Sequence, residues 1–405
     1  MSIRKIAGFT GIVVCCLILF ILSAALISYP QKYIYRVLVW QESDAFDWQK
    51  FPSRELLAPG DTFYFSSAPD KRAEKLLEEL AGVNELEIFL KETGTQSFIV
   101  LKDTLLLYEK YFNGAHRHSV VTSFSVAKSF TSSLIGFAIQ DGFIESVDDP
   151  ITQYLPELPQ RDERFSRITI QHLLMMSSGL EYEKNRLFLF NGDDPLTTYY
   201  PDQRTLALEN THIARNPGMA FDYNKYHPQL LGMILERTTG MSVTAYLQQK
   251  IWNPLCMEFD GSWSLDSEES GFEKMETGVN ARAIDFAKFG RLFLNNGRWQ
   301  GEQLLPEWWV KESTSPFIPG NYTEYYNESV KEMPGKGYYK YMWWGFMQDD
   351  DSYDFMAEGD KGQFIYISPD KNLVIVRNGT GYGLEPNEWI SIFYRFARSL
   401  YSESK

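Results

Sequence analysis

Ser125 and Lys128 stand three residues apart and are the pair in this sequence best suited to chemistry. Apolar residues recur after Ser125 at Ala127, Phe130 and Leu134, which is the spacing of one helix face. The hydroxyl and the amine should therefore be neighbours on one side of a helix. A serine attacks acyl groups well only when a base takes its proton, and a desolvated lysine can act as that base. The stretch predicts a nucleophilic serine at a helix N-terminus, where N–H groups also favour a developing oxyanion.

The pattern Ser-x-x-Lys is a weak signal by itself, because it also begins at Ser2, Ser368 and Ser402. Ser2 and Ser402 lie at the chain ends, where order is least expected. Ser368 opens a predicted hairpin turn, so only Ser125 precedes a long apolar helix. The alternative for Ser125 is a helix N-cap followed by a solvated lysine. A Ser-His-Asp triad is a rival mechanism, but the sequence contains no Gly-x-Ser-x-Gly.

Composition sets the broad class of the protein. The 405 residues allow two or three domains or one composite domain, and 44% hydrophobic with 23% charged residues is typical of a globular protein. The formal net charge of −14 argues against nucleic acid as a partner, because phosphates would be repelled. His116 and His118 flank a turn without further clustered ligands, so no metal or other cofactor is predicted.

Residues 6–28 carry no charge and are almost wholly apolar. About 20 such residues can span a bilayer, so residues 1–30 are predicted to be a membrane anchor with a transmembrane helix. A cleaved signal peptide, with Ser23-Ala24-Ala25 as the cleavage site, is the alternative. Basic residues occur on both sides of the stretch and therefore do not orient it.

The remaining pattern predicts an α/β chain of the α+β type. An antiparallel sheet built from both ends of the chain, flanked by helices, should hold an inserted helical lobe at about 145–300. After a lead-in segment at 31–96, one domain is expected at 97–400. The expected elements are helices at 71–80, 85–91 and 388–400, a hairpin at 97–100 and 104–111, mainly helix at about 126–300, a turn-rich aromatic segment at about 316–347, and a second hairpin at 364–367 and 373–376.

Several short motifs occur in order and give the sequence a family resemblance. The motifs are Ser125-Val126-Ala127-Lys128, Gly142-Phe143-Ile144 with Asp148-Asp149-Pro150 and Tyr154-Leu155-Pro156, the run 168–174, Ser177-Ser178-Gly179-Leu180, Asn216-Pro217-Gly218, Tyr223-Asn224, and the run 230–240. Together they resemble the serine β-lactamase and penicillin-binding-protein superfamily, and within it the class C-type β-lactamase-related hydrolases, which include esterases and amide-oligomer hydrolases.

This resemblance implies a mixed α/β lobe packed on a helical lobe, with the active site between them. It implies acyl transfer through a serine ester, with Ser125 as nucleophile and Lys128 as its basic neighbour. Tyr223 matches the tyrosine that passes the proton to the leaving group, although it could instead be a core aromatic residue. The family also implies a catalytic domain outside the cytoplasm.

The third family motif, on a strand beside the serine, aligns with Asp360-Lys361-Gly362. The resemblance then makes the backbone N–H groups of Ser125 and Gln363 the candidate oxyanion hole. Trp343 and Trp344 either line a substrate cleft or pack in the core, and both readings stay open.

Two residues depart from the family pattern. Lys225 stands where an asparagine would contact the carbonyl group of a substrate, and Asp360 stands where a cation would bind an acidic group. Both departures weaken the case for β-lactam or D-alanyl-peptide recognition and leave Ser125, Lys128 and Tyr223 intact.

The sequence therefore predicts a membrane-anchored serine hydrolase that cleaves a small or peptide-like ester or amide through an acyl-enzyme. A D-alanyl carboxypeptidase or β-lactamase is the alternative among enzymes. A non-catalytic domain that binds a cell-surface ligand is the alternative of another class, and the joint presence of Ser125, Lys128 and Tyr223 speaks against it.

Overall fold

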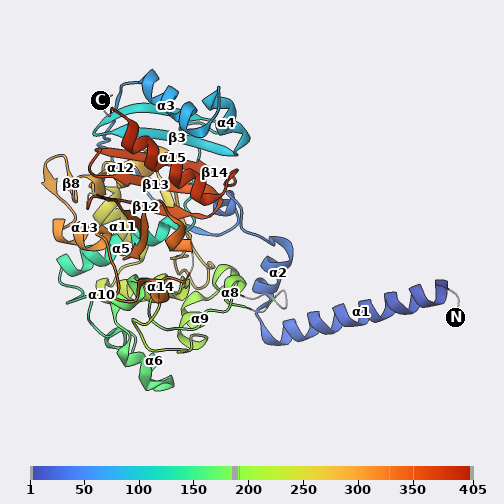
Figure 1. Cartoon of the computed structure of the whole chain (residues 1–405). Helices are drawn as coiled ribbons and strands as arrows, with labels where there is room; N and C mark the ends of the chain where they lie inside the picture. The colour runs from blue at the N-terminus through green and yellow to red at the C-terminus, as the bar shows by residue number, and fades with distance from the viewer. Residues whose placement is uncertain (1–2, 185–189, 191, 328, 350, 402–405) are drawn as a thin grey trace.

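An eight-stranded sheet joins the last third of the chain to the segment before the Ser125 helix (Figure 1). The computed structural model describes residues 3–184, 190, 192–327, 329–349 and 351–401. The strand order is β10-β11-β12-β13-β14-β3-β4-β2. The strands are β2 (Ser66–Ser67), β3 (Thr95–Lys102), β4 (Leu105–Tyr111), β10 (Lys336–Lys340), β11 (Trp343–Met347), β12 (Tyr353–Gly359), β13 (Gln363–Ser368) and β14 (Leu373–Gly379). All neighbours are antiparallel except β2 and β4, so the predicted sheet from both chain ends is confirmed.

Alternation along the central strands gives the sheet two buried faces. On β3, Ile99 and Leu101 face one core cluster, whereas Phe98 and Val100 face the other. The same alternation continues on β14, where Val376 lies opposite Ile99 across the ladder. Because successive side chains of a strand point to opposite faces, a run of apolar β-branched residues requires helices on both sides.

Two groups of helices cover these faces. α3 (Lys71–Ala81), α4 (Leu86–Glu92) and α15 (Pro386–Ser399) cover one face, and α5 (Val126–Gln140) and α12 (Ala283–Leu294) lie against the other (Figure 1). α12 approaches closely at Gly290, where a Cβ atom would lie 2.7 Å from Ile365 and 2.8 Å from Val374. The predicted helices at 71–80, 85–91 and 388–400 and both predicted hairpins are confirmed.

Helices are the most frequent regular elements in the chain between α5 and α12, which also carries part of a second, small sheet. Its helices are α6 (Leu158–Arg161), α7 (Ile170–Leu174), α8 (Asp193–Tyr199), α9 (Gln203–Glu209), α10 (Tyr226–Thr239) and α11 (Val243–Leu247). The small sheet has the order β1-β6-β7-β5, with β1 (Ser53–Leu56), β5 (Val121–Thr122), β6 (Gly261–Ser264) and β7 (Val279–Ala281). The other elements are α2 (Gln31–Val39), β8 (Arg298–Trp299), β9 (Glu302–Gln303), α13 (Glu307–Thr314) and α14 (Tyr322–Tyr325).

The segment expected to be turn-rich contains the strands β10 and β11. Tyr338 pairs with Gly345 across these strands, and a Cβ atom on Gly345 would lie 2.2 Å from the Tyr338 ring. An aromatic ring that covers a cross-strand glycine stabilises the pair. Glycines and turns interrupt the alternation of apolar and polar residues in this segment, so the alternation does not reveal its strands.

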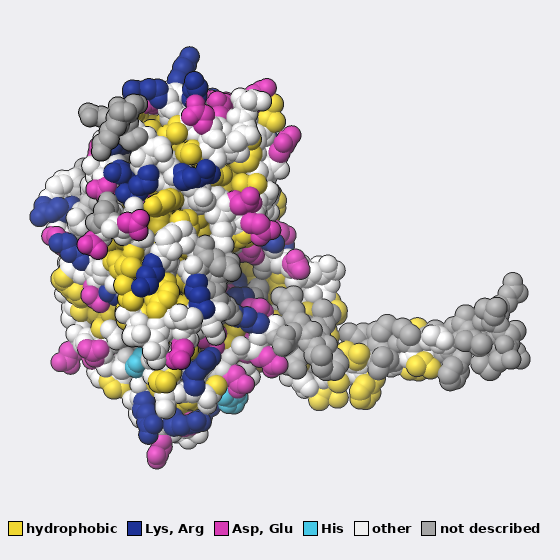
Figure 2. Space-filling model, in the orientation of Figure 1, with side chains coloured by type: hydrophobic (Ala, Val, Ile, Leu, Met, Phe, Trp, Pro, Cys, Tyr) yellow, Lys and Arg dark blue, Asp and Glu magenta, His cyan; other side chains and the backbone are white. Residues whose placement is uncertain are grey.

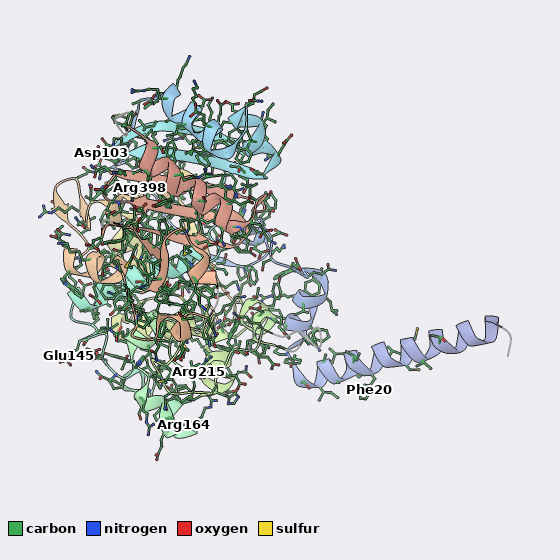
Figure 3. The ribbon with its side chains drawn as sticks, in the orientation of Figure 1. Phe20, Asp103, Glu145, Arg164, Arg215 and Arg398 are labelled. Carbon is green, nitrogen blue, oxygen red and sulfur yellow. The ribbon has the colours of Figure 1, made fainter. Side chains whose placement is uncertain are left out.

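α1 (Ile3–Ser28) extends away from the body of the molecule (Figure 1). Across the described residues, no helix is both long and apolar enough to cross a membrane, so the predicted transmembrane helix at 6–28 is wrong. The membrane partner inferred from it is likewise not supported. Ala25, near the end of α1, is buried against the protein core. Apolar side chains lie along the described part of the helix (Figure 2), and Phe20 points into solvent (Figure 3).

Candidate active site

Ser125 is the N-cap residue immediately before α5, and a tight turn presents it. Phe124 before it is buried and adopts a positive φ of 46°, which is unusual for a residue with a side chain. The backbone N–H of Ser123 donates to the carbonyl O of Val279 on β7 at 2.8 Å, which ties the turn to the small sheet. The Ser125 side chain makes no cap hydrogen bond to the helix. Its hydroxyl therefore remains available to other groups, unlike that of an ordinary N-cap serine.

Lys128 lies on the same side of α5 and reaches the serine directly. Its Nζ donates to Oγ of Ser125 at 2.8 Å and to the carbonyl O of Glu276 at 2.9 Å, and its side chain is buried. Burial lowers the pKa of Lys128 from 10.5 to about 7, with Lys225 acting in the same direction and the carboxylates of Glu276 and Asp194 opposing it. A large share of this amine is unprotonated at neutral pH, as a general base must be.

Tyr223 lies beside the pair, just before α10. Its ring centroid is 5.0 Å from Nζ of Lys128, and the ring stacks on Trp344 at 5.6 Å. Burial raises the pKa of the Tyr223 phenol well above 10, and the Glu358 carboxylate also raises it, while a hydrogen bond with Ser125 opposes both. Tyr223 is therefore a neutral phenol at pH 7, suited to donating a proton rather than to starting as the base.

A cavity of about 440 Å³ opens in front of the serine. Ser125, Tyr223 and Trp344 line it, and so do the acidic residues Glu358, Asp360 and Glu385. Burial raises the pKa of Glu358 to about 7, and the charge of Asp360 adds to this effect against a hydrogen bond from Tyr382. The cavity therefore becomes more negative as the pH rises through neutrality.

The strand next to the serine is β12, and it ends one residue before the predicted third motif. Gly359 lies against the turn, since a Cβ atom there would be 3.1 Å from N of Ser125. Asp360–Gly362 forms a 3-10 turn after the strand, with Lys361 at a φ of 60°. Asp360 lines the serine cavity, whereas Gln363 is buried on β13 and donates from Nε2 to the carbonyl O of Gly379 at 2.7 Å.

The other predicted substrate-binding residues separate into two groups. Lys225 and Lys361 line a neighbouring cavity of about 710 Å³ that Asp360 borders as well, and Lys225 pairs with Asp194 at 2.9 Å. Gly362 and Trp343 lie away from both cavities: a Cβ atom on Gly362 would lie 1.9 Å from the Arg377 guanidinium, and Trp343 packs in the core at 4.4 Å from Phe293. Of the two tryptophans, only Trp344 lines the serine cavity.

Sequence reasoning missed Glu358, Glu385 and Glu276. Glu358 directly precedes Gly359, so a correct end for β12 would have placed its side chain at the cavity. Glu385 lies ahead of α15 and Glu276 lies in a turn before β7, and no local pattern links either residue to Ser125.

Ser178 is a second serine with a basic partner, His227, but this pair is not suited to catalysis. Oγ of Ser178 lies 2.6 Å from Nε2 of His227, and both side chains are buried. The other ring nitrogen of His227 lies 3.0 Å from the Met176 sulfur, and burial lowers the pKa of His227 to about 3. A triad histidine is instead held by a carboxylate that stabilises its charged form, so this pair is a packing feature.

Comparison with known proteins shows the family of the chain. A family model described as Beta-lactamase matches residues 89–387. The 6-aminohexanoate-dimer hydrolase of Paenarthrobacter ureafaciens is 24% identical over 368 residues, which are 86% of this chain and 89% of that protein. Esterase EstB of Burkholderia gladioli is 30% identical over 133 residues, 30% of this chain and 33% of the esterase.

Solved structures agree in fold. A candidate 6-aminohexanoate-dimer hydrolase from Bacillus anthracis matches with a TM-score of 0.71 and 23% identity, covering 85% of this chain and 89% of that chain. Because the family model covers well over half of the sequence, the chain belongs to the beta-lactamase family, and it is a serine hydrolase.

Proposed function

We propose that the protein hydrolyses an ester or amide through an acyl-enzyme formed on Ser125, with Lys128 as the base. The observation that carries this proposal is the 2.8 Å contact between Nζ of Lys128 and Oγ of Ser125. The amine in that contact is buried and has a pKa of about 7. A hydroxyl beside an unprotonated, desolvated amine is the activated nucleophile that acyl transfer requires.

The proposed reaction has two halves. In the first, the Nζ lone pair takes the Ser125 proton while Oγ bonds to the acyl carbon, and the carbonyl oxygen becomes an oxyanion. Collapse of this intermediate breaks the bond to the leaving group, which receives a proton from the Tyr223 phenol, and the phenol regains it from Lys128. In the second, water attacks the serine ester in the same way and releases the acid and Ser125.

The oxyanion would be held by backbone N–H groups at the contact between α5 and β12. Ser125 supplies one, and we propose Asp360 rather than Gln363 for the other, because Asp360 follows Gly359 and borders the cavity. The Gln363 side chain is engaged with the Gly379 carbonyl and the Asn378 amide, which suits a structural role.

The substrate class is a small or peptide-like amide or ester. The names of the relatives, an amide-dimer hydrolase and an esterase, support these two bond types. Three acidic residues line the cavity, so we propose that neutral or cationic substrates enter more readily than anionic ones. This preference argues against D-alanyl peptides and β-lactams, both of which carry a carboxylate.

A serine-directed fluorophosphonate tests the proposal. Peptide mapping should find the label on Ser125, and Ser125→Ala should lose it. Ser368→Ala is the matched control, because Ser368 begins another Ser-x-x-Lys sequence, lies at the end of β13 and should have no effect. Labelling that persists in Ser125→Ala would refute the assignment of the nucleophile. Turnover of a panel of esters, amides and β-lactams by the labelled and unlabelled protein would then identify the bond type.

A further inference from the structure

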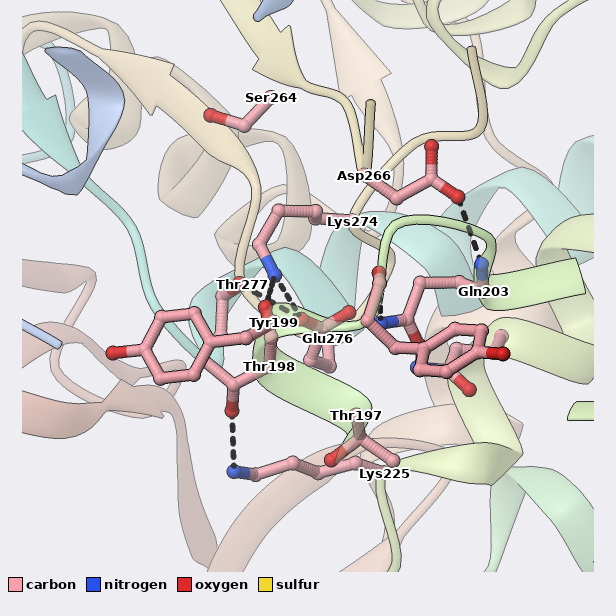
Figure 4. Close-up of polar contacts among 12 residues, drawn as sticks. Thr197, Thr198, Tyr199, Gln203, Lys225, Ser264, Asp266, Lys274, Glu276 and Thr277 are labelled. Atoms are coloured by element: carbon pink, nitrogen blue, oxygen red, sulfur yellow. Dashed lines mark hydrogen bonds and ion pairs between the residues drawn. The ribbon is translucent and has the colours of Figure 1, made fainter. Parts of the chain in front are cut away.

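A buried ion pair lies directly behind the Lys128 amine. Nζ of Lys274 is 2.9 Å from Oε1 of Glu276, and the two side chains are 4% and 0% exposed (Figure 4). The second oxygen of Glu276, Oε2, is buried and has no hydrogen-bond partner among the described residues. Burial of two charges costs free energy that close contact repays only in part, so such a pair calls for a reason beyond stability.

Hydrogen bonds fix this pair and the turn that carries it, between β6 and β7. Lys274 donates from Nζ to the carbonyl O of Thr198 on α8 at 2.6 Å. Oγ1 of Thr277 donates to Oε1 of Glu276 at 3.2 Å, and the N–H of Gly278 donates to the carbonyl O of Lys274 at 2.8 Å. The turn is thereby held between α8 and the small sheet.

This fixed turn presents the Glu276 carbonyl to Lys128 at 2.9 Å. When the amine is neutral, one N–H remains bound to that carbonyl, so the lone pair can face Oγ of Ser125, 2.8 Å away. The contact thus orients the base as well as holding it in place.

We propose that Glu276 is a positioning residue for Lys128: Lys274 anchors it, its carbonyl orients the amine, and its carboxylate balances the charge that Lys128 gains from Ser125. The inference rests on the proposed roles of Ser125 and Lys128. A buried ion pair that lies outside the cavity would thus take part in proton transfer.

The surroundings of Lys128 single out Glu276 among the charged groups. The groups that face the amine are Glu276 from the turn, Lys225 ahead of α10, Asp194 from α8 and the Tyr223 phenol. Lys225 and Asp194 pair with each other at 2.9 Å, so their effects on Lys128 oppose one another. Glu276 exerts the largest charge effect and holds the pKa of Lys128 up against burial.

Two variants of the full chain test this role through the pH dependence of fluorophosphonate labelling between pH 5 and 9. Glu276→Gln keeps the shape of the side chain and removes its charge, so the midpoint of the rise in labelling rate should fall by about one pH unit. Lys274→Met leaves the Glu276 charge uncompensated, so the midpoint should rise. Shifts in opposite directions distinguish positioning from a loss of fold, which would lower the rate at every pH without moving the midpoint.

Asp285→Asn is the matched control. Asp285 belongs to another buried ion pair, 3.7 Å from Lys288, and is not among the groups that face Lys128, so its midpoint should match that of the wild type. If Glu276→Gln does not fold, the double variant Lys274→Met with Glu276→Met replaces the pair by apolar side chains, and its midpoint should also fall.

An unchanged midpoint in the folded Glu276 variant, or shifts of the same sign in both single variants, overturns the inference. Such a result leaves the proposed function standing if Ser125→Ala still abolishes labelling. Labelling in Ser125→Ala would instead refute the proposed function itself.

Discussion

Gly359 packs against the backbone that carries Ser125, with no side chain between them. A Cβ atom at Gly359 would lie 2.4 Å from the carbonyl O of Ser123 and 3.1 Å from N of Ser125. This contact joins the end of β12 to the start of α5 and sets the distance between the serine and the N–H of Asp360.

Gly359→Ala should therefore reduce kcat, because the new methyl group pushes β12 away from α5. Loss of one oxyanion-hole donor costs about 10²–10³ in kcat, and we expect a loss of this order in a folded protein. Steady-state kinetics with a neutral ester and a thermal unfolding curve measure both effects. Gly381→Ala is the control, since a Cβ atom there meets nothing within 4 Å. A Gly359→Ala variant with wild-type kcat would exclude the close contact as a feature of the site.

Hydrolysis should increase as the pH rises through about 7. Only the free amine of Lys128 can accept the Ser125 proton, and burial lowers the pKa of this group to about 7. Below that pH the amine is an ammonium group and the serine is not activated. Lys128→Met should remove this pH dependence and reduce kcat by about 10²–10⁴. A pH profile of kcat/KM measured on both proteins is the test.

Lys128→Met should increase the stability of the protein at pH 7 although it lowers kcat. The folded-state pKa of Lys128 lies below its unfolded value of 10.5, so the unfolded chain binds more protons between about pH 7 and 10.5. Stability of the wild type therefore increases with pH across this window. Lys128→Met should be more stable than the wild type at pH 7 and should lose that slope. Denaturant unfolding of both proteins at pH 7 and pH 10 is the test. If the free energy of unfolding depends on pH in the same way in both proteins, the prediction is contradicted.

Asp360 should disfavour anionic substrates. This acidic residue lines the serine cavity, and like charges 4 Å apart repel by about 1 kcal/mol in water and by more in a less polar cleft. The ratio of kcat/KM for a neutral ester to that for its carboxylate-bearing analogue should exceed one. Asp360→Asn should lower this ratio roughly fivefold, the equivalent of about 1 kcal/mol. Equal or faster hydrolysis of the anionic ester by the wild type would contradict the prediction.

Glu358 should make this discrimination depend on pH. Burial raises the pKa of Glu358 to about 7, so its carboxyl is mainly neutral at pH 6 and mainly charged at pH 8. The preference for the neutral ester should therefore increase between these two values. Glu358→Gln, which keeps the size of the side chain and cannot ionise, should show the same ratio at both. A wild-type ratio that is constant from pH 6 to pH 8 would exclude Glu358 from the substrate path.

The features that the sequence predicts well depend on the spacing of residues that lie close together in the chain. Ser125 and Lys128 meet because residues three apart share a helix face, and the helix that holds them is marked by its apolar periodicity. The two hairpins follow from short apolar runs on either side of turn residues. None of these features depends on contacts between distant parts of the chain.

The position of the third motif relative to Ser125 depends on contacts between distant parts of the chain. Gly359 and Gln363 lie opposite each other on β12 and β13, and Gly359 lies against the backbone of Ser125. Spacing along the chain does not reveal which strand of a hairpin faces a distant helix, so the sequence alone predicts Gln363 as the oxyanion donor where we propose Asp360. The transmembrane prediction for residues 6–28 also failed, because no helix of the described residues is long and apolar enough to cross a membrane.

The order of strands in the large sheet places the two parts of the site far apart along the chain. The serine and its lysine belong to the first third of the chain, whereas Gly359 and the strand beside it come near its end. β3 lies between β14 and β4 in the sheet, and its register partners on β14 come 270 or more residues later in the chain, as in the pairing of Lys102 with Leu373. A nascent chain on the ribosome thus contains its nucleophile long before it has the wall that completes the cavity. The serine cavity therefore takes its full lining only when residues 333–390 have been added to the chain.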